Sequence, residues 1–349
     1  KKMHMPFPQT RYQGSKLKLL NWFNTIFQKM DFDTVLDAFG GTGAVSYMFK
    51  TMGKKTTYND LLKSNWYIGK AIIENNHTKL NPSKINSLYT TENGFNYRKI
   101  IQDQFKDIYY TNDENVLLDV VVQNIYNLKN QYEKALSFFA LFQACIQKRP
   151  FNLFHRKNLY LRLNNVKRSF GNKKTWDTPF PELMLRAIKE GNKAIFDNSR
   201  SNNALNYSIL DIPTPDEGYD LVYLDPPYIS PKGIGVDYRD YYHFLEGMCN
   251  YNRWEDLIDF SSKHKRLKPI ENAWSDPKQI LKAVEKTISK FQESKLVFSY
   301  RDPGIPSVTV LKSILLSYKK KVTISVKDYK YALTSKKKEV KEILLISEK

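Results

Sequence analysis

Residues 33–43 read DTVLDAFGGTG, and this segment sets the architecture expected for the rest of the chain. Its first part, Asp33–Gly40, is predicted to form a short buried strand that ends in a glycine-rich turn. Helical spacing of apolar side chains follows over Gly43–Thr51, then a second strand pattern over Lys55–Asp60 and a second helical pattern over Leu61–Asn75. This order of elements predicts the start of a doubly wound α/β sheet.

The same pattern resumes in the last third of the chain, after a long interruption. The interruption contains a segment with helical spacing, Val116–Gln147. Beyond it, the expected strands and helices are Tyr207–Ile212, Tyr219–Leu224, the helix Pro277–Gln292, Leu296–Tyr300, the helix Val308–Ser317, and a closing pair of strands, Val322–Val326 and Val340–Ile346. We therefore expect one α/β domain formed by residues 1–76 and 201–349, with a mostly helical domain, residues 77–200, inserted into it.

Composition restricts the class of protein. The chain has 349 residues, and 41% of them are hydrophobic, which is enough for a large α/β core. No apolar run is long enough to span a bilayer, and the first residues lack the apolar core of a secretory signal. The two cysteines, Cys145 and Cys249, are isolated in sequence, so neither a disulfide framework nor a metal site is expected. These features predict a cytoplasmic protein with reduced thiols.

The formal net charge of +19 points to a polyanionic partner, because Lys and Arg that neutralise phosphates release counterions. The alternative is a basic surface that only water covers. A basic, aromatic segment, Arg149–Trp176, concentrates the charge and is the expected nucleic-acid contact. Its candidates for phosphate or base contacts are Arg149, Arg156, Arg162, Arg168, Asn172 and Lys173, of which Asn172 could read adenine and Arg168 guanine.

The glycine turn is a candidate cofactor site. Asp37, Phe39, Gly41 and Gly43 lie at the end of the first predicted strand, where glycines let a ligand approach the helix N-terminus closely. Asp60 ends the next strand, and a carboxylate in that position can accept hydrogen bonds from the two ribose hydroxyls of a nucleoside. This pattern fits a nicotinamide cofactor as well as S-adenosylmethionine, and such a turn can also be without a ligand.

Asp225-Pro226-Pro227-Tyr228 follows directly after the hydrophobic run Leu221–Leu224 and is the more specific signal. The prolines fix the backbone and have no N–H group, so the carbonyls around them remain acceptors beside the Asp225 carboxylate. An exocyclic amine needs two acceptors, and the Tyr228 ring offers a face for stacking. We interpret the segment as a site for an amino-purine or amino-pyrimidine, against the alternative of a proline-rich turn with a buried tyrosine.

The order of glycine turn, basic insertion and Asp-Pro-Pro-Tyr resembles the Dam-like (D12 class, α-group) DNA adenine-N6 methyltransferases. Residues 11–16 (RYQGSK) resemble the N-terminal motif of that family, and Phe39-x-Gly41-x-Gly43 resembles its cofactor turn. The Asn59-Asp60 pair, residues 209–212 (ILDI) and residues 299–301 (SYR) resemble further motifs. The resemblance extends from Arg11 to Ile346 and is weakest between His77 and Gln147.

The resemblance implies a Rossmann-like, seven-stranded methyltransferase sheet with an antiparallel last strand, and a target-recognition role for the inserted domain. It also implies that S-adenosylmethionine is the cofactor and that Tyr12, Lys16, Asp60, Asp211 and Ile212 line its pocket. Double-stranded DNA would be the substrate, and Asp225 and Tyr228 would face an adenine taken out of the duplex. A restriction–modification system, with its cognate endonuclease on a separate chain, is the expected setting.

Direct transfer to N6 follows from these residue types, because acceptors at Asp225 and the Pro226 carbonyl would turn the amine lone pair toward the donor methyl group. The alternatives are an RNA adenine methyltransferase, a cytosine-N4 methyltransferase, a nicotinamide-dependent oxidoreductase, and a DNA-binding module without catalysis. The absence of a third glycine in the turn disfavours the oxidoreductase.

Tyr238–Leu245 is interpreted either as a loop closing over the base or as a helix packed on the sheet, with His243 as a structural residue.

Overall fold

A seven-stranded sheet forms the centre of the α/β part of the molecule in the computed structural model, which describes residues 6–8, 15–164, 173–327 and 340–348. From edge to edge, the strands are β3 (Asn203–Leu205), β2 (Lys55–Asn59), β1 (Thr34–Asp37), β4 (Leu221–Leu224), β5 (Lys295–Asp302), β7 (Lys341–Ser347) and β6 (Val322–Lys327). The pairings among β3, β2, β1, β4 and β5 are all parallel. β7 runs antiparallel to both β5 and β6, as expected for a methyltransferase-type sheet.

Helices cover both faces of the sheet. Successive residues of each strand point to opposite faces, so each strand contributes to a core on either side. Val35 belongs to the core beneath α1 (Leu20–Phe27) and α2 (Ala44–Thr51), which lie on one face. Its neighbour Leu36 belongs to the core beneath α14 (Ile280–Lys290) and α15 (Val308–Leu316) on the other face. The apolar runs seen in the sequence are therefore strands buried on both sides, as parallel sheets require.

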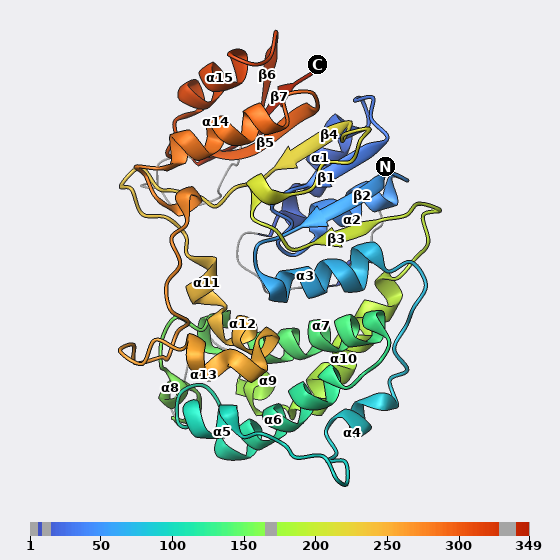
Figure 1. The fold of residues 1–349 in the computed structure, drawn as a ribbon, viewed down its shortest axis with the longest axis vertical. Helices are drawn as coiled ribbons and strands as arrows, with labels where there is room; N and C mark the ends of the chain where they lie inside the picture. The colour runs from blue at the N-terminus through green and yellow to red at the C-terminus, as the bar shows by residue number, and fades with distance from the viewer. Residues whose placement is uncertain (1–5, 9–14, 165–172, 328–339, 349) are drawn as a thin grey trace.

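A lobe of helices lies below the sheet in the view of Figure 1. This helical lobe comprises α4 (Lys84–Leu88), α5 (Ile100–Gln104), α6 (Asn112–Tyr126), α7 (Gln131–Gln147), α8 (Leu159–Leu163), α9 (Lys173–Asp177), α10 (Phe180–Ala194), α11 (Tyr238–Tyr241), α12 (His243–Cys249) and α13 (Trp254–Leu257). The helix α3 (Lys63–Gly69) joins the lobe to the sheet, with the Tyr67 ring 4.6 Å from that of Phe138 on α7. One hydrophobic core is continuous from Tyr58 of the sheet to Leu267 beyond α13.

The helical lobe contains helices that come before β4 in the chain and helices that come after it. α11, α12 and α13 follow the Asp-Pro-Pro-Tyr segment, yet they pack against the inserted helices: Phe244 stacks on Phe154 at 5.4 Å, and Trp254 lies 4.9 Å from Phe105. Of the two interpretations of Tyr238–Leu245, the structure has the helical one, although the helices pack in the lobe and not on the sheet. None of the helices within the described ranges has the length and apolar character needed to cross a membrane.

Two expectations about local structure were wrong. The segment Val116–Gln147 is two helices and not one, because Asn130 caps α7 by accepting from the N–H groups of Tyr132 and Glu133. Tyr207–Ile212 is not a strand: β3 ends at Leu205, and residues 209–211 form a 3-10 turn. The reason is that the Asn59 side chain occupies both the N–H and the carbonyl of Tyr207, each at 3.0 Å, in place of a neighbouring strand.

Gly247 on α12 tests the packing of the helical lobe. A β-carbon at this position would lie 1.9 Å from the buried Trp254 ring, so Gly247→Ala should lower the free energy of unfolding by about 1–3 kcal/mol. Gly191→Ala on α10 is the matched control, because its β-carbon would lie 3.3 Å from Phe139 and the helix gains propensity. Urea denaturation measures both; equal stability of the two variants would contradict the packing described here.

Candidate active site

One cavity of about 780 Å³ lies at the carboxyl ends of the parallel strands. Residues at or just after the carboxyl ends of β1, β2, β4 and β5 line it, together with residues from the segments 235–240 and 266–275. In open α/β sheets this edge is where ligands bind, because the strand ends leave a crevice there. The cavity brings together candidate cofactor and base-binding residues that lie far apart in the sequence: Lys16, Asp37, Phe39, Gly41, Asp60 and residues Asp225–Tyr228.

The glycine turn fits tightly against the neighbouring strand. Gly41 and Gly43 have left-handed backbones, with φ of 54° and 81°, which favour glycine. A β-carbon at Gly40 would lie 2.1 Å from the Tyr58 ring, so only glycine fits. Tyr58 in turn donates a 2.6 Å hydrogen bond to the carbonyl of Gly41. The turn is therefore shaped by contacts of its own chain and presents its outer side to the cavity.

Asp60 closes this turn from the end of β2. Its carboxylate accepts hydrogen bonds from the N–H groups of Gly41 and Leu62, both at 2.9 Å. Burial nevertheless raises its pKa to about 6, against the lowering effect of these bonds. Glu246, on α12, holds the next residues by accepting from the N–H groups of Lys63 and Ser64 at the start of α3.

Asp37 is the most deeply buried carboxylate of the cavity, with 1% of its surface exposed. One of its oxygens accepts a 2.7 Å hydrogen bond from the Ser46 hydroxyl, and the other has no partner among the described residues. Burial, with repulsion from Asp225 and Asp60, raises the pKa of Asp37 to about 7. A buried acceptor without a partner is costly, so this oxygen is available to a ligand donor.

The Asp225 carboxylate lies 3.3 Å from Nζ of Lys16. Burial raises the pKa of Asp225, and the Lys16 ammonium opposes that effect. Tyr228 is held by a 2.5 Å hydrogen bond from its hydroxyl to the carbonyl of Pro303, while the Arg301 guanidinium lies 5.5 Å from the centre of its ring. Pro226 and Pro227 lie half-buried between them on the cavity wall. The segment thus offers acceptors and an anchored aromatic ring together.

Three expected cofactor residues, Gly43, Asp211 and Ile212, are not on the cavity wall. Ser208 and Ile209 line the cavity, but Asp211 and Ile212 do not. The 3-10 turn at residues 209–211 leaves Asp211 exposed, and Ile212 belongs to the core beneath α14. Tyr12 lies outside the described residues.

Two of the arginines expected to contact DNA are buried in the structure. Arg149 is 1% exposed: it stacks over the Tyr109 ring at 4.3 Å and donates to the carbonyls of Leu153 and Arg156. Arg162 is 6% exposed and forms an ion pair with Glu114 at 2.6 Å. Both guanidinium groups are used inside the helical lobe, where phosphates cannot reach them.

The other candidates for DNA contact in the basic segment are either exposed or outside the described residues. Arg156 and Lys173 are exposed on the helical lobe, so both can be reached from solvent. Arg168 and Asn172 lie outside the described residues, and their proposed roles as base readers are not tested by the structure.

Several cavity residues had no signal in the sequence. Trp274 packs edge-on against Phe39, with ring centroids 5.0 Å apart, and Tyr238, Arg239 and Glu271 also line the wall. They lie in segments without a recognisable motif. The only local indication in the sequence is the aromatic run YRDYYHFL after Asp-Pro-Pro-Tyr, which fits both a loop and a helix.

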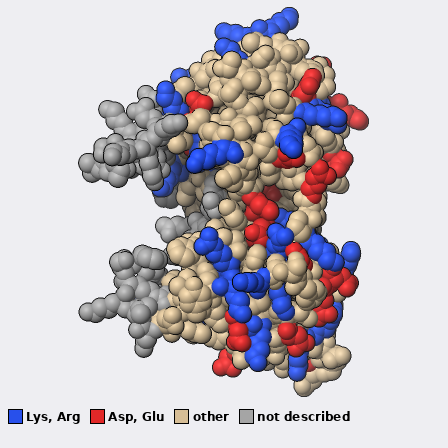
Figure 2. Space-filling model, turned by 90° about the vertical axis from the view of Figure 1, so that its left-hand side faces the viewer, with Lys and Arg blue, Asp and Glu red and all other residues tan. Residues whose placement is uncertain are grey.

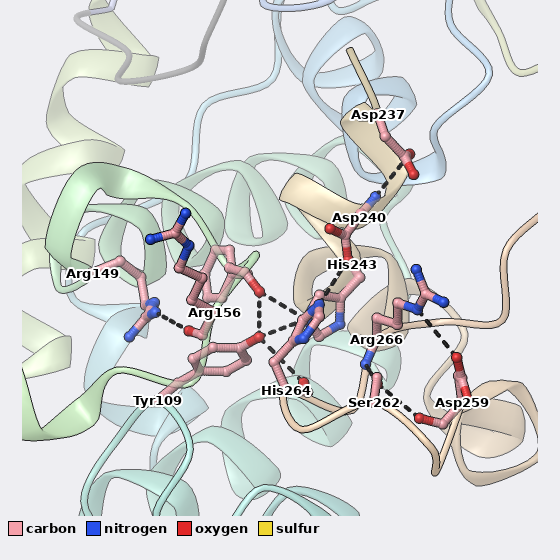
Figure 3. Close-up of polar contacts among 11 residues, drawn as sticks. Tyr109, Arg149, Arg156, Asp237, Asp240, His243, Asp259, Ser262, His264 and Arg266 are labelled. Atoms are coloured by element: carbon pink, nitrogen blue, oxygen red, sulfur yellow. Dashed lines mark hydrogen bonds and ion pairs between the residues drawn. The ribbon is translucent and has the colours of Figure 1, made fainter. Parts of the chain in front are cut away.

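A polar network joins these segments to the helical lobe (Figure 3). The Tyr109 hydroxyl lies 2.6 Å from Nε2 of His243 and donates to the carbonyl of Phe154. His264 bonds Asp240 at 2.8 Å, and Asp240 lies on the cavity wall. Burial lowers the pKa of His243 to about 3, which keeps the ring neutral. This is the structural role expected for His243.

Comparison with known proteins agrees with this geometry. The family model described as D12 class N6 adenine-specific DNA methyltransferase matches residues 12–342. The Type II methyltransferase M2.HphI of Haemophilus parahaemolyticus is 26% identical over 350 residues, covering 97% of each chain.

Two further relatives are longer than this chain. The modification methylase StsI of Streptococcus sanguinis is 26% identical over 96% of this chain, and the Type II methyltransferase M.FokI of Planomicrobium okeanokoites is 25% identical over 88% of it. The aligned regions are 51% and 47% of those two proteins, so the chain spans about half the length of each.

The raised pKa of Asp37 predicts that stability depends on pH. Between about pH 4 and pH 7 the native state keeps a proton that the unfolded chain has released, so the free energy of unfolding should fall as pH rises, by up to about 4 kcal/mol. Asp37→Asn removes this pH dependence, so the free energy of unfolding of the variant should rise relative to that of the wild type as pH increases. Urea denaturation at the two ends of this pH range measures the difference in free energy of unfolding between the variant and the wild type, with the exposed Asp216→Asn as control. A difference that does not change with pH would refute the assignment.

Proposed function

This chain belongs to the D12 class N6 adenine-specific DNA methyltransferases, and on that premise we propose that its cavity is where S-adenosylmethionine donates a methyl group to N6 of an adenine taken out of duplex DNA. The observation that carries the proposal is the position of Asp225–Tyr228 at the end of β4, on the same wall as the glycine turn. A methyl donor and an amino acceptor must meet in one site, and this cavity contains features for both.

The cavity suits the proposed cofactor by its charge. Asp37, Asp60 and Asp225 share it, and repulsion from the other two carboxylates contributes to the raised pKa of Asp37. S-adenosylmethionine carries a sulfonium and an ammonium against one carboxylate, so its net charge is positive and complements this wall. The glycine turn gives close backbone approach, Asp60 provides an acceptor for ribose hydroxyls, and Phe39 with Trp274 provides an apolar wall. When bound, the cofactor supplies a methyl group already activated by the positive sulfur.

The residues of the chain act on the amine. Asp225 and the carbonyl of Pro226 accept the two N–H groups of N6, which returns electron density to nitrogen and orients its lone pair. Tyr228 stacks on the base, which offsets part of the few kcal/mol needed to extrude it. Its ring is positioned in advance by the bond to Pro303, so orientation is established before the base arrives.

The helical lobe is the proposed target-recognition part of the molecule. Figure 2 shows Lys and Arg side chains on both sides of the waist between the sheet and the helical lobe. Arg156 and Lys173 are exposed and suited to phosphates, and Arg168 and Asn172 remain the proposed base readers. The proposed recognition unit is residues 77–200 together with α11–α13, because these helices share one core.

Two aspects of the setting are also proposals. The relatives are named as Type II methyltransferases and modification methylases, which favours a restriction–modification system with the endonuclease on another chain. Because the substrate is DNA, we place the enzyme in the cytoplasm of a prokaryotic cell, at the nucleoid.

Asp225→Asn tests the proposed chemistry. The substitution keeps the shape but exchanges one acceptor oxygen for an amide that donates, so methyl transfer to duplex DNA should fall by at least about 100-fold. Binding of S-adenosylmethionine by calorimetry and of DNA by fluorescence anisotropy should change little. Transfer is followed with radiolabelled donor on duplex DNA and on RNA, and sequencing of modified bases identifies atom and motif. Wild-type rates in this variant, with Asp216→Asn as the active control, would refute the acceptor role.

The Lys16–Asp225 pair predicts a pH profile. Asp225 is the strongest acceptor when ionised, because protonation makes one of its oxygens a donor, and burial raises its pKa. Turnover at saturating substrates should therefore fall on the acidic side at a pH above the ordinary carboxyl range. Lys16→Met removes the opposing charge and should move this fall to higher pH, whereas Lys16→Arg should restore it. Turnover measured from about pH 5 to about pH 9 tests this prediction. A fall in turnover at the same acidic pH in Lys16→Met and in the wild type would contradict the pairing.

A further inference from the structure

Arg239 differs from the other arginines of the cavity wall. Three line it: Arg239, Arg266 and Arg301. Arg266 forms an ion pair with Asp259 at 3.1 Å, and Arg301 forms one with Glu342 at 3.2 Å. Within the described part of the chain, Arg239 has no such carboxylate partner. It donates only one long hydrogen bond, 3.5 Å from Nη2 to the carbonyl of Lys268.

The polar atoms of Arg239 are also incompletely used. Its Nε is buried without a hydrogen-bond partner among the described residues. A buried N–H without an acceptor is unfavourable, and a guanidinium has five donors in a planar fork that fits a carboxylate or a phosphate. Glu246, whose charge lies nearby, already has both oxygens bound by the N–H groups at the start of α3. The free donors of Arg239 therefore suit an anionic group from outside the chain.

The backbone that carries Arg239 is anchored on both sides. The side chain of Asp237 caps α11 by accepting from the N–H of Asp240 at 3.1 Å. The Asp240 carboxylate is bound in turn by His264 at 2.8 Å (Figure 3). Arg239 thus lies on a turn fixed at its first and last residues, which restricts where its fork can point. Fixing a binding group before its ligand arrives reduces the entropy lost on binding.

The place of α11 indicates which anion arrives. The helix lies at the junction between the sheet and the helical lobe (Figure 1). Tyr238, next to Arg239, lines the same cavity as Asp225 and Tyr228. An extruded nucleotide brings its own phosphates to the mouth of the site, because the sugar–phosphate backbone stays continuous. Resting on the proposed function, we propose that Arg239 binds a phosphate of the DNA strand next to the extruded adenine.

Duplexes with one neutral phosphate test this assignment directly. The substrate is the site that the wild type methylates, with a methylphosphonate placed in turn on each side of the target adenine. On wild type, one of the two replacements should lower kcat/KM by about 10- to 100-fold, the effect of losing a charge-assisted hydrogen bond. Arg239→Gln should show a similar loss on unmodified DNA and less than about a twofold further loss at that same phosphate.

Two further variants separate this role from a general loss of structure. Arg266→Gln removes a neighbouring guanidinium that already has a partner, and it should keep the full sensitivity to the methylphosphonate. Arg239→Lys keeps the charge and should regain part of the sensitivity. The salt dependence of DNA binding should lose about one phosphate contact in Arg239→Gln. Its affinity for S-adenosylmethionine, measured by calorimetry without DNA, should equal that of wild type.

The outcomes that overturn the proposal are distinct. Equal sensitivity of wild type and Arg239→Gln at both phosphates would show that Arg239 contacts neither. A tenfold or greater loss of cofactor affinity, with full sensitivity to the methylphosphonate retained, would assign Arg239 to the carboxylate of the cofactor instead. A wild-type enzyme that fails to methylate the unmodified duplex would instead refute the proposed function itself.

Discussion

The grouping of three carboxylates at the ends of adjacent parallel strands is the constraint on which this site depends. Asp37 ends β1, and Asp60 and Asp225 follow β2 and β4, so the register of the sheet places all three on one cavity wall. Burial raises each pKa, which means that the fold keeps these groups together at a cost in stability. The neighbouring bonds counter that cost only in part: Lys16 lies against Asp225, and backbone N–H groups bind Asp60. A ligand with positive charge, such as the proposed cofactor, would offset the remainder of this cost.

The sequence predicted this part of the molecule because its signals are local. Asp37 and Asp225 follow directly after short apolar runs, Asp60 ends the strand pattern Lys55–Asp60, and glycine or proline follows the apolar runs at Gly40 and at Pro226. The order of these runs predicted a doubly wound α/β sheet and the edge where a ligand binds, and the family resemblance added the seven-stranded form with an antiparallel last strand. The roles of individual residues at that edge, however, came from a family resemblance, and for Asp211 the local conformation did not carry the side chain to the cavity.

What the sequence could not predict depends on contacts between residues far apart in the chain. Arg162 and Glu114 are 48 residues apart, and nothing in the basic run 149–176 indicates that Arg162 is neutralised inside the lobe. Charge in a sequence predicts a surface only when the side chains are exposed, and burial is set by tertiary packing. The same limit applies to Trp274, which reaches Phe39 from a segment without any motif. Arg239 is the converse case: in the sequence it lies between Tyr238 and Asp240, and only the structure shows that it has no carboxylate partner among the described residues.

The segment after β4 gives the two halves of the site a common support. α12 is packed in the core of the helical lobe, and its Glu246 holds the first N–H groups of α3, immediately after the loop that Asp60 closes. α11 presents Tyr238 and Arg239 to the cavity from the same stretch of chain. Any shift of α12 must therefore either carry the Asp60 loop with it or break two hydrogen bonds to a buried carboxylate. Since breaking such bonds costs about 1.5–3 kcal/mol each, moving together is the cheaper response, and the sides of the cavity proposed for the base and for the cofactor would move as one unit.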